Sequence, residues 1–147
     1  MSRLVAGVAV LLVTLGASAA WASDADVMRA FDLLGTWAID CSAPSAPRNP
    51  YTTFADTGTG VTRTLEMGLP DLDGTYGVRA AVQVDHQHIA LELDDATHVF
   101  KKVVIVKFGD GWYTERAEDA DGSALIRDGR FAGNDAPVPR FRRCSGP

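Results

Sequence analysis

The chain is poor in the side chains on which most catalytic and metal sites depend. Its 147 residues include two cysteines and three histidines, and its net charge is −5. It contains no G-x-S-x-G elbow, no phosphate-binding P-loop and no H-E-x-x-H zinc motif. The lack of excess basic residues argues against a nucleic-acid partner. Carboxylates are plentiful enough to keep an acid–base pair open, but the sequence favours a protein without enzymatic activity and indicates no cofactor.

The N-terminal segment has the features of a secretory signal. Arg3 supplies the positive charge, residues 4–15 are mostly apolar, and residues 20–22 read Ala-Trp-Ala, an A-x-A-like cleavage site. The apolar run is shorter than the roughly 20 residues that a membrane-spanning helix needs, and no later segment is longer. We therefore expect residues 1–22 to be a signal peptide. Residues 23–147 then form a single domain, periplasmic or secreted, without a transmembrane segment.

The two cysteines, Cys41 and Cys144, lie near opposite ends of this domain. An exported chain with exactly this pair most simply forms one disulfide bond. A reactive thiol would need a neighbouring base, and neither cysteine has a histidine close to it in the sequence. The sequence therefore predicts a structural disulfide that joins the first and last segments of the domain.

The rest of the domain has the pattern of a mostly β protein. Residues 23–34 place apolar side chains at helical spacing, with Ser23 or Asp24 as a cap and Gly35 as the stop, and predict one short helix. After residue 35 short alternating segments are separated by Gly-, Pro- and Asp-rich turns. We expect an all-β fold: a small antiparallel barrel or sandwich of 8–9 strands, with its first and last strands joined by the disulfide. The predicted strands cover residues 36–41, 51–55, 61–67, 76–84, 88–93, 99–108, 112–117, 124–127 and 140–144.

One predicted hairpin suggests an interior site. With residues 94–95 as a two-residue turn, Ile89 faces Phe100, and the apolar faces of the two strands coincide. This register places Phe100 and Val104 on the core face, and it also places Lys102 there.

A lysine between apolar residues on the inner face of a barrel can bind the carboxylate or phosphate of a ligand. The alternatives are that a bulge or a different register places Lys102 in solvent, or that its stem reaches the mouth of the barrel. With Trp112 as a further lining residue, the predicted ligand-binding site consists of Phe100, Lys102, Val104 and Trp112. Its ligand would be small and partly apolar or anionic.

Metal sites are incompletely specified. His86 and His88 lie on one face of a strand, but zinc needs three or four ligands and the predicted register turns His98 to the other side. The segments 71–74 and 119–122 both read Asp-x-Asp-Gly and resemble the start of a calcium loop, yet both lack its later oxygen donors. We interpret them as turns and predict no metal site.

Two short motifs suggest a family. Gly35-Thr36-Trp37 opens the first predicted strand, and Arg142 and Arg143 lie in the last strand beside the second cysteine. This pattern resembles that of the calycin superfamily, the lipocalins and related small secreted bacterial barrels. In those proteins an arginine of the last strand packs across the tryptophan and closes one end of the barrel. The resemblance implies this role for Trp37 and for one of the two arginines.

Two functions follow as hypotheses. The first is an exported barrel that binds a small, partly apolar ligand or an envelope component. The alternative is a protease inhibitor or another protein-interaction module that acts through its N-terminal segment, residues 23–34. The resemblance also implies the alternative, because the superfamily includes secreted bacterial inhibitors of metalloproteases whose N-terminal segment enters the protease.

Overall fold

The computed structural model describes residues 22–94 and 100–146, so almost all of the predicted signal peptide lies outside it. Within this part of the chain, no helix is long and apolar enough to cross a membrane. The elements are α1 (Asp24–Ala30), β1 (Gly35–Ala38), β2 (Tyr51–Asp56), β3 (Val61–Glu66), β4 (Gly74–Gln83), β5 (His88–Leu93), β6 (Lys102–Phe108), β7 (Gly111–Glu118), β8 (Ala124–Arg127), β9 (Arg130–Phe131) and β10 (Arg140–Ser145).

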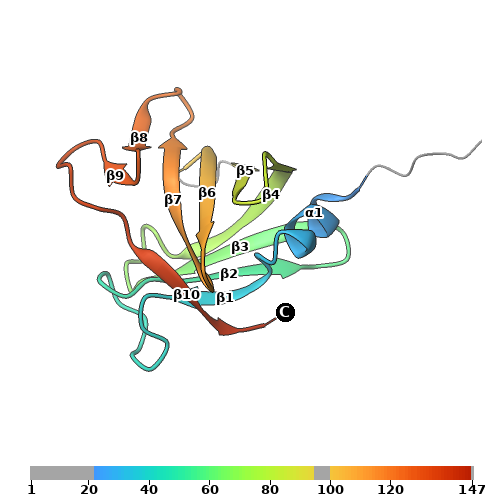
Figure 1. Cartoon of the computed structure of the whole chain (residues 1–147). Helices are drawn as coiled ribbons and strands as arrows, with labels where there is room; N and C mark the ends of the chain where they lie inside the picture. Colours follow the sequence, from blue (N-terminus) through green and yellow to red (C-terminus); the bar gives the residue numbers. More distant parts are fainter. Residues whose placement is uncertain (1–21, 95–99, 147) are drawn as a thin grey trace, which may run out of the picture.

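The strands form a closed barrel rather than a sandwich. Each of β1 to β7 pairs antiparallel with the next strand, and β10 pairs with both β7 and β1. Eight strands therefore complete the ring, while β8 and β9 extend from β7 as an additional hairpin (Figure 1). The predicted all-β fold, the short helix and the antiparallel strands are confirmed.

The register predicted for β5 and β6 is wrong. Ile89 pairs with Ile105 rather than with Phe100, a shift of five residues. An odd shift exchanges the two faces of a strand, so Val103 and Ile105 are buried in the core and Lys102 is exposed. The turn is longer than two residues because β6 begins only at Lys102.

The helix ends earlier than predicted, for a local reason. Asp32 adopts a positive φ of 59°, and its backbone N–H donates to the carbonyl of Arg29 at 3.0 Å. The N–H of Leu33 donates to the carbonyl of Met28 at 2.9 Å. This pair of hydrogen bonds is a Schellman-type termination with Asp32 in the left-handed position, so the helix stops before Gly35.

The helix α1 covers one end of the barrel. Ser23 and Asp26 form a capping box at its start, and Met28 and Phe31 are fully or almost fully buried. The Lys107 Nζ donates to the carbonyl of Phe31 at 2.9 Å, which joins the helix to the end of β6. The helix therefore acts as a plug whose apolar face completes the core.

The centre of the core is aromatic. Trp112 stacks on Phe141 with 4.3 Å between ring centroids, and Trp37 and Phe54 lie at 6.2 and 6.1 Å from Trp112. The indole N–H of Trp37 donates to the carbonyl of Leu33 at 2.8 Å. The buried indole N–H of Trp112 has no hydrogen-bond partner among the described residues, so within that part of the chain Trp112 contributes through packing.

Candidate ligand-binding site

A cavity of about 210 Å³ lies at the end of the barrel opposite α1. The helix contacts the last residues of β2 and β6, through Asp56 and Lys107. The cavity is lined by Pro50 and Phe100, which precede those same strands, so plug and cavity occupy opposite ends. Apolar side chains from several elements complete the lining, among them Leu65, Met67, Leu72, Ile126, Phe131 and Phe141.

Arg63 is the only charged residue among the described residues that line this cavity. It lies on β3 between the inward-facing Val61 and Leu65, where strand alternation turns its side chain into the barrel. Its Nε donates to the buried hydroxyl of Thr52 at 3.1 Å. Arg63 is half-buried, and partial removal of its guanidinium from water lowers its pKa to about 10, although the nearby Tyr76 acts in the opposite direction. Arg63 therefore remains charged at neutral pH.

The four residues predicted to bind a ligand are not brought together. Phe100 lines the cavity, and Trp112 lies beneath it in the core, stacked on Phe141. Lys102 and Val104 lie outside, in a shallow groove over β4 to β7. Their predicted place on the core face is corrected by the register of β5 and β6, which turns both outward.

The cation that lines the cavity is Arg63, a residue not among the predicted site residues. The sequence held the same kind of signal for Arg63 as for Lys102. The predicted strand 61–67 alternates Val61, Arg63 and Leu65 on one face. Both strands thus carry a charged residue at a position of the predicted apolar face. Of the two, only Arg63 on β3 lies inside the barrel.

The closed end of the barrel contains the pair suggested by the calycin resemblance. The Arg143 guanidinium lies 4.2 Å from the centroid of the Trp37 ring and donates to the carbonyls of Leu34 and Asp32, each at 2.7 Å. A side chain at Gly35 would place its Cβ 2.5 Å from the carbonyl oxygen of Ser145. Gly35 is thus required where β1 meets β10.

Arg142 has a different position from its neighbour. It is exposed, and in the described structure its guanidinium makes no hydrogen bond or ion pair. The Cys41–Cys144 disulfide is formed, with 5.3 Å between the Cα atoms and 103 residues between the cysteines in sequence. It joins the end of the β1 segment to β10, which confirms the predicted link between the first and last strands.

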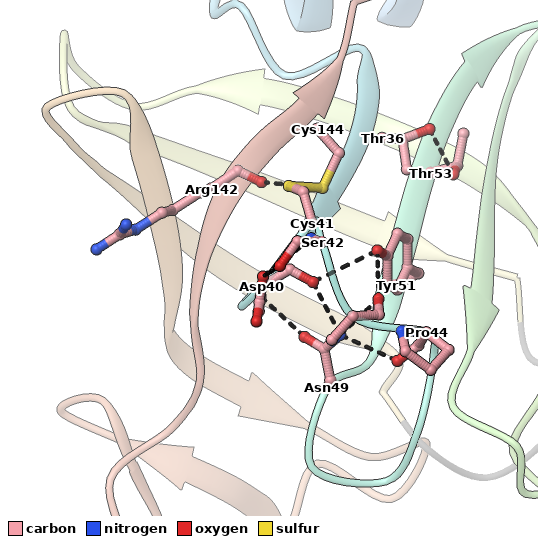
Figure 2. The surroundings of a disulfide bond; sticks show 11 residues. Thr36, Asp40, Cys41, Ser42, Pro44, Asn49, Tyr51, Thr53, Arg142 and Cys144 are labelled. Atoms are coloured by element: carbon pink, nitrogen blue, oxygen red, sulfur yellow. Dashed lines mark hydrogen bonds between the residues drawn. A yellow bond between two sulfur atoms is a disulfide. The ribbon is translucent and has the colours of Figure 1, made fainter.

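The loop after Cys41 is fixed by hydrogen bonds from the side chains of Asn49 and Tyr51. The Asn49 Nδ2 donates to the carbonyls of Asp40, Ala43 and Pro44. Figure 2 shows Asn49 with Asp40 and Pro44 beside the disulfide. The Tyr51 hydroxyl also donates to Ala43 at 2.8 Å. These bonds fix the proline-rich loop at the start of β2, next to the cavity.

The predicted metal-site candidates are placed separately. His86 is exposed in the turn before β5, His88 pairs with Asp85, and His98 lies outside the described residues. Among the residues described, no three His, Cys, Asp or Glu side chains are grouped to hold a metal ion. In the two Asp-x-Asp-Gly segments, Asp73 and Asp119 accept backbone hydrogen bonds within their own turns.

Replacing Asp85 by Asn is expected to flatten the dependence of stability on acidic pH. The His88 imidazole, followed by the backbone N–H of Gln87, holds the pKa of Asp85 at about 2. A depressed pKa stabilises the fold above the unfolded value of about 3.9, and this contribution is lost as pH falls toward 2. Urea midpoints at pH 5 and pH 2.5 should differ less in Asp85→Asn than in the wild type. Asp121→Asn is the control, because that exposed carboxylate accepts no hydrogen bond in the described structure; an equal change in both variants would contradict the assignment.

Comparison of the chain with known protein families, curated proteins and solved structures found no match.

Proposed function

We propose that this protein binds a small, partly apolar ligand in the open end of its barrel. The observation that carries the proposal is the cavity of about 210 Å³ opposite α1. Its lining is predominantly apolar, with the hydroxyl of Thr114 and the guanidinium of Arg63 as its polar side-chain groups. A concave apolar surface with few polar groups is the usual composition of a small-molecule site.

The volume limits the size of the ligand. At about 210 Å³ the cavity is smaller than the roughly 300–1,000 Å³ of pockets that hold drug-sized ligands. That suits a compact molecule of six to eight carbon atoms better than a long acyl chain. Phe131 is partly exposed at 36% and also lines the cavity, so the β8–β9 hairpin contributes to its rim.

The proposal is tested by titrating the protein with hexanamide, a neutral compact amphiphile, and recording backbone amide NMR shifts. Saturable shifts are expected at the cavity residues, because burial of its alkyl chain is favourable at about 0.8 kcal/mol for each CH₂. Leu72→Trp should weaken binding at least tenfold, since Leu72 is half-buried and lines the cavity.

The matched control is Leu69→Trp. Leu69 lies in the same β3–β4 loop but is 37% exposed and is not among the lining residues. This variant should bind hexanamide as the wild type does. Absence of saturable shifts both with hexanamide and with its carboxylate analogue hexanoate, or an equal effect of both tryptophans, would overturn the proposal.

The proposal also groups the chain with the calycin barrels. It is supported by the Arg143 guanidinium over Trp37, and by its hydrogen bonds to Leu34 and Asp32 in the segment between α1 and β1.

We further propose that the protein is exported, in agreement with its disulfide, because such bonds persist in oxidising compartments. The alternative function, a protein-interaction module acting through residues 23–34, stays a prediction.

A further inference from the structure

We infer that the ligand of the open-end cavity is a compact monocarboxylate and that Arg63 binds its carboxylate. This inference rests on the proposed function, since it specifies the chemical class of the ligand at the same site. Its basis is a charged side chain, enclosed by the barrel and facing the cavity, that the described residues leave without an anionic partner.

The guanidinium of Arg63 is held in one orientation by its surroundings. Its Nε donates to Thr52, whose side chain is fully buried. The rings of Phe54 and Phe100 each lie with their centroids 6.0 Å from the guanidinium carbon. Both rings reduce access of water to the cation, and the hydrogen bond to Thr52 fixes the direction of its fork.

The charge of Arg63 is uncompensated within the described part of the chain. No Asp or Glu there forms an ion pair with it, whereas Arg29, Arg79 and Arg143 each have a carboxylate within 2.8 Å. Its two terminal nitrogens make no hydrogen bond to the described residues. Arg63 is half-buried, and a charge partly removed from water without an anionic partner is retained most readily where a ligand supplies the opposite charge.

The donor geometry and the space beside Arg63 select a carboxylate. The two terminal nitrogens present parallel N–H groups, which match the two oxygens of a carboxylate in a bidentate pair. The apolar lining, including Leu65 and Phe141, accommodates the remainder of the ligand. The combination favours a short aliphatic or small aromatic acid over a neutral amphiphile and disfavours a cation.

The test compares hexanoate, hexanamide and hexyl sulfate by the same NMR titration of the full exported domain. Wild-type protein should bind hexanoate about tenfold to a hundredfold more tightly than hexanamide, the factor expected for hydrogen bonds to a charged group. In Arg63→Met this preference should fall to about one, because the variant keeps the side-chain length and loses the charge.

Arg63→Met is expected to fold, because the variant also removes the cost of desolvating a charge that has no ionic partner in the described structure. Arg63→Lys keeps the charge but not the planar pair of N–H donors, and should retain only part of the preference for hexanoate over hexanamide. The control Arg48→Met removes an exposed arginine that makes no ion pair in the described structure, and should leave the preference unchanged.

The set of outcomes distinguishes failure of the carboxylate assignment from failure of the proposed function. Equal binding of hexanoate and hexanamide by the wild type, lost in both cases in Leu72→Trp, would overturn the role of Arg63 and leave the proposed function standing. Binding of neither compound would overturn both. Tighter binding of hexyl sulfate than of hexanoate would overturn the choice of a carboxylate, and an unchanged preference in Arg63→Met would overturn the assignment of the residue.

Discussion

Removal of the Cys41–Cys144 disulfide is expected to lower the free energy of unfolding by about 4–5 kcal/mol, the value that loop-closure entropy gives for a loop of about 100 residues. The cysteines are 103 residues apart, so the bond restricts almost the whole domain in its unfolded state. A small domain is typically stable by about 5–15 kcal/mol, so the loss would remove a large part of the total.

The measurement is urea unfolding of the Cys41→Ser, Cys144→Ser double variant and of the wild type with and without reductant. The native barrel should persist in the reduced protein, because β10 is also paired with β1 and β7 through backbone hydrogen bonds. The urea dependence of the free energy should become steeper, since the unfolded chain expands. Reductant should have no effect on the double variant. A wild type whose unfolding is unchanged by reduction would contradict the prediction.

Much of the barrel could be predicted because its strands are short and separated by strong turn signals. β5 and β8 occupy the predicted residues, and the predicted caps and turns at Ser23, Asp73 and Asp119 perform those roles. These features depend on residues close in sequence. β9 was not predicted, because a strand of two residues, Arg130–Phe131, is too short to display an alternating pattern.

The pairing of β5 with β6 shows where local patterns stop being informative. The segment that becomes β6 has apolar residues at both odd and even positions, so Val103 and Ile105 fill the core face as well as Val104 and Val106 would. Alternation alone therefore fits two registers. The choice is made by closure of the whole barrel, in which β6 must also pair with β7 around a bulge between Val104 and Ile105.

Of the four residues predicted to form a ligand site, Phe100 alone lines the cavity. The alternating pattern predicted Lys102 on the inner face of the barrel, but Lys102 is exposed and Arg63 lies there. The cavity itself could not be predicted, because its lining combines the β3–β4 loop, β8 and the start of β10. These segments are distant in sequence and meet only in the folded barrel.

Replacing Arg143 by Met is expected to lower the free energy of unfolding by about 3 kcal/mol, from lost hydrogen bonds to a charged group and a cation–π contact. Arg143 donates to the carbonyls of Leu34 and Asp32, pairs with the Asp32 carboxylate at 2.8 Å and covers the ring of Trp37. It thereby joins the last strand to the segment between α1 and β1. Without it, these carbonyls lose a charged donor at the closed end of the barrel.

The matched control is Arg142→Met, which makes the same chemical change one residue away. Arg142 is exposed and makes no side-chain hydrogen bond in the described structure, so its loss should change stability by no more than about 0.5 kcal/mol. The free energy of unfolding of Arg143→Lys should lie between those of the wild type and Arg143→Met. Lysine keeps the charge but cannot donate to two carbonyls while covering an indole ring. Hydrogen exchange at α1 should rise selectively in Arg143→Met, since the helix is the element that this side chain helps to hold. Equal destabilisation by Arg142→Met and Arg143→Met would show that the position of the charge has no importance, and the role of Arg143 in closing the barrel would then be untenable.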